Sequence, residues 1–177
     1  MANVYINKKK IVIVSINDNQ TAKDIAAQLK TDGFKNVVVL SAPKSYPGYY
    51  NVADAAADYT LFVEESASCK VQPCRVEGYA RDRLGHIVSR DLAESQRAKA
   101  CFRHHLKMLE LEPYLLGTQE IPFDEVRAIP WYYLDKSPML YFKTPRVQGV
   151  AQAASAAIRD YFKQYRTVDP KRHYGIQ

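Results

Sequence analysis

Residues 11–40 read IVIVSINDNQTAKDIAAQLKTDGFKNVVVL and decide the fold of this chain. Residues 11–16 are rich in β-branched side chains, which is typical of a buried strand. The next segment places apolar side chains on one helical face, which predicts a helix capped by Thr21 and ended by Gly33 in the left-handed conformation. Residues 37–40 form a second apolar run. A strand, a helix and a strand joined by short turns predict a parallel pair with a right-handed crossover.

The length of 177 residues favours one domain over two. A composition of 47% hydrophobic and 25% charged residues is typical of a soluble globular protein and excludes collagen-like, coiled-coil and wholly disordered classes. No apolar run approaches the roughly 18 residues that a membrane span requires.

The chain carries 25 Lys and Arg residues against 19 Asp and Glu residues, a formal net charge of +6. A nucleic-acid interface would gather its basic residues on one face with aromatic residues between them. Here the basic residues are spread along the chain, which favours a solvated surface of mixed sign. Nucleic acid is therefore not the favoured partner.

The region after residue 40 predicts an antiparallel meander. Residues 59–63 are a candidate strand, and residues 74–81 and 86–92 are candidate strands joined by the DRLG turn at 82–85. We expect an α/β (α+β) fold with a mixed sheet of about five strands and helices near 21–32, 94–109 and 147–165 packed against it.

The expected organisation is one α/β domain over residues 1–177. It divides into a core (11–117), an irregular segment rich in proline and aromatic residues (118–146), a C-terminal helix (147–165) and a basic tail (166–177). Each proline removes a backbone donor and obstructs the preceding helical turn, so the irregular segment cannot be one regular helix. Short edge strands would be compatible with it.

The cysteines permit two interpretations. Cys69 and Cys74 would flank the first hairpin of the meander, where facing α carbons approach within about 6 Å, the reach of a disulfide. This predicts a structural disulfide if the protein is exported. Their spacing is not the two-residue spacing of a catalytic dithiol.

Zinc is the alternative interpretation. A tetrahedral ion could take Cys69, Cys74, Cys101 and either His104 or His105, because Cys101 and His104 lie one helical turn apart. However, Cys101 and His105 also match the apolar face of their predicted helix, and cysteine is commonly buried as a small hydrophobic residue. The favoured prediction is no cofactor and no metal.

No catalytic residues are predicted, because no glycine-rich phosphate loop, nucleophile elbow or zinc-protease motif is present. The first strand and the Asn17-Asp18 pair resemble the opening of a response-regulator receiver domain, which requires a second acidic residue that Asn17 does not supply. Glu64 and Glu65 stand at the end of the comparable third strand. Adjacent strand residues point to opposite faces, so we expect these two carboxylates at a solvated strand end and without a shared substrate.

Two aromatic clusters are candidate interaction surfaces. Tyrosine and tryptophan bury a large area with few rotatable bonds, so they are common at protein interfaces. A second core beneath the long loops is an equally good interpretation. The residues are Tyr46, Tyr49, Tyr50, Trp131, Tyr132 and Tyr133.

The order of elements resembles bacterial envelope proteins of TolB N-terminal or CsgG-like layout over residues 11–117. The resemblance is carried by the phrase ADYTLFV at 57–63 and the hairpin DRLGHIV at 82–88. It implies a non-enzymatic periplasmic domain of an outer-membrane lipoprotein or secretion component, tethered through a removed N-terminal lipid anchor and acting through contacts with other envelope proteins. The alternative is a cytoplasmic, zinc-stabilised basic domain that binds nucleic acid.

Overall fold

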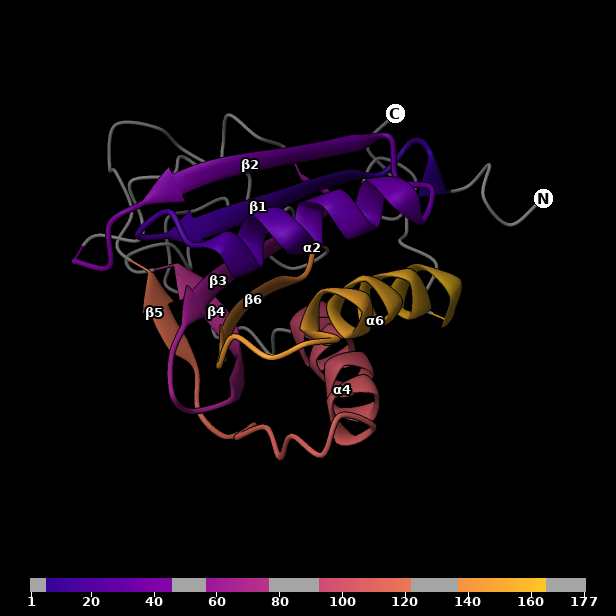
Figure 1. Ribbon diagram of the computed structural model, residues 1–177. Coiled ribbons are helices and arrows are strands. Elements are labelled where there is room, and N and C mark those ends of the chain that lie inside the picture. The colour runs from indigo at the N-terminus through magenta and orange to yellow at the C-terminus, as the bar shows by residue number, and fades with distance from the viewer. Residues whose placement is uncertain (1–5, 46–56, 77–92, 122–136, 165–177) are drawn as a thin grey trace, which may run out of the picture.

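The computed structural model describes residues 6–45, 57–76, 93–121 and 137–164 (Figure 1). Within these residues, six strands form one sheet in the order β2-β1-β3-β6-β4-β5. The strands are β1 (Lys10–Ile16), β2 (Asn36–Ala42), β3 (Tyr59–Glu65), β4 (Lys70–Val76), β5 (Gln119–Ile121) and β6 (Met139–Thr144); the helices are α2 (Gln20–Thr31), α4 (Ala93–Lys107) and α6 (Val150–Gln164).

This arrangement confirms the predicted α/β class, with a mixed sheet and helices packed against it. The sheet has one strand more than the five expected, and the shortest strand is the three-residue β5. The helices begin and end within a few residues of their predicted bounds. Apolar periodicity locates a helix without knowledge of its partners, which is why this part of the prediction holds.

The first strand, helix and strand form the predicted parallel unit. β1 pairs with β2 in parallel, with Ile11 opposite Val37. α2 ends as predicted, because Gly33 adopts a φ of 111° and donates its N–H to the carbonyl of Lys30, while Phe34 donates to that of Leu29. These two bonds satisfy carbonyls that the end of a helix leaves unpaired.

The start of α2 corrects the predicted cap. The capping residue is Asn19, whose side-chain oxygen accepts from the N–H of Ala22 at 2.8 Å. The Thr21 hydroxyl donates to the Glu65 carboxylate at 2.8 Å instead. Both residue types can cap a helix, and the contact with β3 decides between them.

β6 lies inside the sheet, between β3 and β4. It comes from the segment that was expected to be irregular, and its pattern of burial covers both faces of the strand. A parallel strand in the middle of a sheet reads as a continuous apolar run, and MLYF at 139–142 is such a run. Pro138 precedes the strand, where a missing backbone donor is tolerated.

The position of β6 corrects the predicted meander. β4 pairs with β6 in antiparallel and with β5 in parallel orientation, and it does not pair with β3. It also begins at Lys70, four residues before the expected strand start. The second predicted hairpin strand and its turn, at 82–92, lie outside the described residues.

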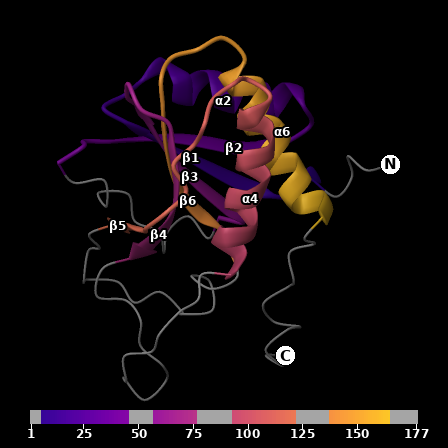
Figure 2. The ribbon, with the colours of Figure 1, turned by 90° about the horizontal axis from the view of Figure 1, so that it is seen from below.

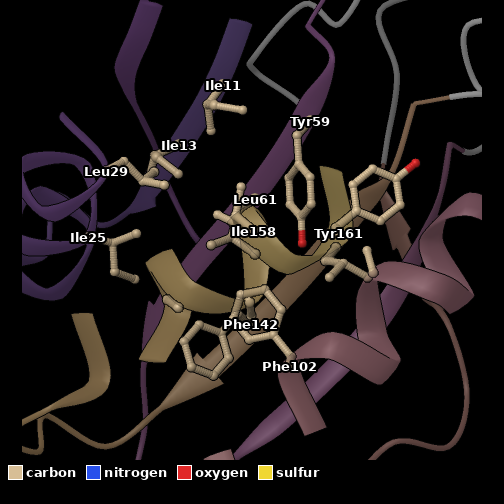
Figure 3. Close-up of a cluster of buried hydrophobic side chains, with 14 of the residues drawn as sticks. Ile11, Ile13, Ile25, Leu29, Tyr59, Leu61, Phe102, Phe142, Ile158 and Tyr161 are labelled. Atoms are coloured by element: carbon tan, nitrogen blue, oxygen red, sulfur yellow. The ribbon is translucent and has the colours of Figure 1, made fainter. Parts of the chain in front are cut away.

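Side chains alternate between the two faces of the sheet. α2, α4 and α6 lie along one face, which we call the helix face (Figures 1 and 2). Ile11 and Ile13 of β1 point to it, whereas Val12 and Val14 belong to a separate buried cluster on the opposite face. Side chains from the strands and from all three helices meet in the helix-face core (Figure 3): Ile11, Ile13, Ile25, Leu29, Tyr59, Leu61, Phe102, Phe142, Ile158 and Tyr161.

Candidate functional site

Four neighbouring strands, β2, β1, β3 and β6, run parallel, so their carboxyl ends meet at one edge of the sheet. The chain passes from β1 to β2 on one side and then to β3 on the other side. Such a reversal is a topological switch point, and ligands of open α/β sheets bind outside the carboxyl ends of the strands at this point. We call the polar side chains there the carboxyl-edge site: Asn17, Asp18, Asn19, Lys44, Glu64, Glu65 and Tyr141.

The turn after β1 holds two successive residues in the left-handed region, Asn17 at a φ of 59° and Asp18 at a φ of 53°. This backbone costs about 1–3 kcal/mol in a residue with a side chain, and asparagine and aspartate tolerate it best. The N–H of Asn17 donates to the carbonyl of Ala42 at 2.8 Å, and its side-chain oxygen accepts from the N–H of Lys44 at 3.0 Å. These bonds tie the turn to the end of β2.

Asn19 joins three elements. Its side-chain amide donates to the carbonyl of Ile16 at 2.9 Å and to that of Val63 at 2.7 Å, at the ends of β1 and β3. Its side-chain oxygen caps α2, and its own N–H donates to the Ser15 hydroxyl at 2.7 Å. All polar groups of this side chain have partners, so Asn19 supports the site and is not its reactive group.

The amino end of α2 is already occupied by a carboxylate of the protein. Glu65 accepts from the N–H of Thr21 at 3.1 Å and from its hydroxyl at 2.8 Å. Negative charge is favourable at this end of a helix. Because Glu65 and the Asn19 cap take these donors, the start of α2 offers no open phosphate cradle.

Glu64, the neighbouring residue, is buried with only 5% of its surface exposed. Its Oε1 accepts from the Tyr141 hydroxyl at 2.7 Å, and its Oε2 lies 3.4 Å from Nζ of Lys44. The Lys44 side chain is 64% exposed. The expectation of a solvated strand end is therefore wrong for Glu64, because β6 carries Tyr141 beside it. Glu64 and Glu65 make separate contacts, with Tyr141 and with Thr21, and the expectation that they share no substrate stays a prediction.

The position of Tyr141 is fixed by a second contact besides the one with Glu64. Its ring stacks on that of Phe62, with centroids 5.9 Å apart and planes 8° apart. Burial, and then the hydrogen bond to Glu64, raises the pKa of the Tyr141 phenol well above its ordinary value. The phenol keeps its proton and serves Glu64 as a neutral donor.

A second ion pair lies at the same edge. Nζ of Lys23 is 3.4 Å from Oδ1 of Asp18, with side-chain exposures of 49% and 64%. The Ser41 hydroxyl lies 3.5 Å from the same oxygen. The pair has the same separation as Lys44 and Glu64, but both of its members face solvent. Burial of the carboxylate is thus what distinguishes Glu64 from Asp18.

The predicted disulfide between Cys69 and Cys74 is wrong. All three cysteines, Cys69, Cys74 and Cys101, are free. Cys69 immediately precedes β4 and packs against the helix-face core, whereas Cys74 lies within β4 and belongs to the cluster on the opposite face. Residues five apart along an extended chain are separated by about 16 Å, far beyond the reach of a disulfide.

The same geometry separates the alternative zinc ligands. Cys69 and Cys74 belong to opposite faces of the sheet, so they cannot bind one ion together with Cys101 and His104. No group of three or more His, Cys, Asp or Glu side chains suited to a metal occurs among the described residues. His105, the other candidate, pairs with Asp160 of α6 at 2.5 Å. Cys101 is buried in the helix-face core, as the hydrophobic interpretation expected.

The aromatic clusters proposed as contact surfaces stay predictions. Tyr46, Tyr49, Tyr50, Trp131, Tyr132 and Tyr133 lie outside the described residues. Within the part of the chain that is described, no helix is long and apolar enough to cross a membrane.

Sequence reasoning missed Lys44 and Tyr141. Lys44 follows the end of β2 by two residues, which was a usable signal once a parallel sheet was expected. Tyr141 sits inside an apolar run and reads as a core residue. Its contact with Glu64 spans 77 residues of sequence, so no local pattern reveals it.

No family profile and no curated protein matches this chain. Among solved structures, the chain is similar to the crystal structure of AF0625, described as a conserved protein of unknown function, with a TM-score of 0.50 and 13% sequence identity. The match covers 92% of this chain and 66% of that chain, just under two thirds of its length. At this identity, the similarity concerns the fold alone.

Proposed function

We propose that this protein binds a small polar ligand at the carboxyl-edge site, with Glu64 as the ligand-contacting group. The observation that carries this proposal is the burial of the Glu64 carboxylate at the carboxyl end of a central parallel strand. This is the position at which α/β sheets bind their ligands.

The energetics of Glu64 favour a functional role. A buried carboxylate is costly unless charges and hydrogen bonds compensate for its lost hydration. Tyr141 satisfies one oxygen well at 2.7 Å, but the contact of the other oxygen with Lys44 at 3.4 Å is long for a charged hydrogen bond. An apolar residue would stabilise the strand more simply, so a carboxylate at this position favours a use other than stability.

The surrounding residues are organised as a binding site requires. Asn19 fixes the ends of β1 and β3, and the Asn17 turn is tied to β2. A site that is rigid before the ligand arrives loses less conformational entropy when it binds. Binding at Glu64 would therefore require little reordering of the turns around it.

The test is a ligand screen by NMR with uniformly ¹⁵N-labelled protein. We expect members of a panel of amino acids, amines, sugars, nucleotides and carboxylic acids to shift amide signals in residues 15–19, 41–44, 63–66 and 141–144. Glu64→Gln removes the charge with little change of shape, and we expect it to abolish these shifts. Asp24→Asn is the matched control, because it also neutralises a carboxylate, but one that is exposed on α2, accepts from Gln20 and lies outside the carboxyl-edge site.

Two results would contradict the proposal. The first is a panel in which no compound shifts these signals in the wild-type protein. The second is a set of shifts that Glu64→Gln leaves intact, because Glu64 would then be a structural group only.

A further inference from the structure

Resting on the proposed function, we propose that the ligand of the carboxyl-edge site is a primary amine, whose ammonium group replaces that of Lys44 as the counter-ion of Glu64. Lys44 itself supplies the first argument, because an ammonium group already stands beside this carboxylate. A ligand of the same chemistry needs no change in the polarity of the site.

The two oxygens of Glu64 are unequal. Oε1 receives the Tyr141 proton at 2.7 Å, a short hydrogen bond. Oε2 faces Nζ of Lys44 at 3.4 Å, whereas an ammonium donor that bonds well to a carboxylate stands at about 2.7–2.9 Å. Oε2 therefore keeps acceptor capacity that a better-placed ammonium group can use.

Lys44 is easy to displace. Its backbone is anchored by the bond from its N–H to Asn17 at 3.0 Å, but its side chain is 64% exposed. An exposed ammonium group gains little from such a contact, because water competes and the long side chain loses freedom. The ammonium group can move into solvent while the loop stays in place.

The charge pattern argues against other ligand classes. An anion would approach Glu64 directly, and the helix end that could attract it already carries Glu65. A divalent cation would require more carboxylate, imidazole or thiolate groups together than the described residues supply. A single ammonium group matches the one carboxylate oxygen, Oε2, that only the long contact with Lys44 occupies among the described residues.

The experiment uses n-butylammonium chloride, which reproduces the lysine side chain, titrated into the ¹⁵N-labelled chain of 177 residues. The wild type should bind it with millimolar affinity at the amides of residues 63–65. Lys44→Ala should bind it about two- to fivefold more tightly, because the internal competitor is gone and exposed ion pairs have about that strength. Lys44→Ala combined with Glu64→Gln should lose the binding.

Lys23→Ala is the matched control, since it removes a lysine with the same 3.4 Å contact from the exposed Asp18. It should leave the affinity unchanged. Sodium butyrate and sodium chloride at equal ionic strength should give no site-specific shifts. Circular dichroism melts of each variant establish that it is folded.

Equal binding by wild type and Lys44→Ala, or binding that survives Glu64→Gln, would overturn the amine inference. If n-butylammonium fails while another compound of the panel gives Glu64-dependent shifts, the binding function stands and only the amine class is wrong. If every compound fails, both proposals fall.

Discussion

Replacement of Tyr59 by phenylalanine should stabilise this protein. Tyr59 is fully buried in the helix-face core (Figure 3), and its hydroxyl has no hydrogen-bond partner among the described residues. Burial, and then the nearby Cys101, raises the pKa of this phenol, so it stays neutral. Its hydroxyl thus lost its hydration on folding without a replacement.

The expected gain is the cost of that unsatisfied group. A buried polar group without a partner costs about 1–3 kcal/mol, and phenylalanine removes it without opening a cavity. Tyr59→Phe should therefore raise the free energy of unfolding by about 1–3 kcal/mol. In a chain of this size, each kcal/mol raises Tm by about 2–4 °C.

Tyr161 provides a control in the same cluster. Its ring packs edge-on against that of Tyr59, with centroids 5.6 Å apart, but its hydroxyl donates to Oε1 of Glu94 at 2.6 Å. Tyr161→Phe removes a hydrogen bond to a charged group and should destabilise the protein by about 1.5–3 kcal/mol. The same chemical change should thus have opposite signs at two touching rings.

Urea unfolding followed by circular dichroism measures both variants, and an unchanged m-value shows that only stability has changed. A loss of 1 kcal/mol or more in Tyr59→Phe would refute the reasoning, because the hydroxyl would then have a partner that stabilises the fold. A stabilised Tyr161→Phe would refute the control. The pair of signs, and not either value alone, tests the argument.

Three further predictions concern the Asn19 side chain and the cysteine thiols. Asn19→Ala should lower the free energy of unfolding by at least about 2 kcal/mol in urea titrations, since it removes the α2 cap and two donors to strand ends. Asn19→Ser, whose hydroxyl can still cap the helix, should lose less. Unreduced protein in denaturant should show three reactive thiols by Ellman titration, and Cys69, half-buried, should react first in the folded state. Burial raises the pKa of Cys69 and of Cys101 from 9.0 to about 11. The unfolded chain therefore loses these thiol protons at a lower pH than the folded protein does. The free energy of unfolding should be unaffected by the thiols below pH 9 and should fall as the pH rises from 9 to about 11. A free energy of unfolding that stays constant over this range would contradict the prediction.

The parts of the fold that could be predicted are those that depend on residues close together in the sequence. Thirty consecutive residues contain the apolar periodicity of α2, the glycine after it and the two flanking apolar runs. The parallel unit of strand, helix and strand can therefore be predicted from this segment alone. The start of α2 was less predictable, because Thr21 and Asn19 are both good caps and Glu65 decides between them.

The order of the sheet was not predictable in the same way. Strands that follow each other in sequence usually lie side by side, which led to β4 being placed next to β3. The pairing of Phe62 with Tyr141 is a non-local contact, and only burial of both faces of β6 favours it. The placement of β6 beside β3 depends on the assembled sheet. In the sequence, only a short apolar run indicates it.

The predicted disulfide failed for a related reason. A spacing of five residues fits a hairpin and also fits one continuous strand, and the two have opposite consequences. Across a hairpin, the thiols of Cys69 and Cys74 would meet. Along one extended segment, an odd separation puts them on opposite faces, and in the structure Cys69, directly before β4, and Cys74, within it, pack into the clusters on opposite faces of the sheet. Cysteine spacing becomes informative only after the strand ends are known.

The candidate site follows from the same logic applied to the ends of strands. Three apolar runs of this sequence are each followed by polar residues: Asn17 and Asp18 after β1, Lys44 after β2, and Glu65 as the last residue of β3. In a parallel sheet these positions must converge, so the location of the site was within reach of the sequence. Its chemistry was not, because alternation says that Glu64 and Glu65 face opposite sides but not which side is covered. Tyr141, brought in by β6, makes one carboxylate a buried acceptor and leaves the other on the helix. A functional difference between two adjacent glutamates is therefore set by a strand that begins more than 70 residues later, and a search for such sites should examine the ends of strands after their order in the sheet is known.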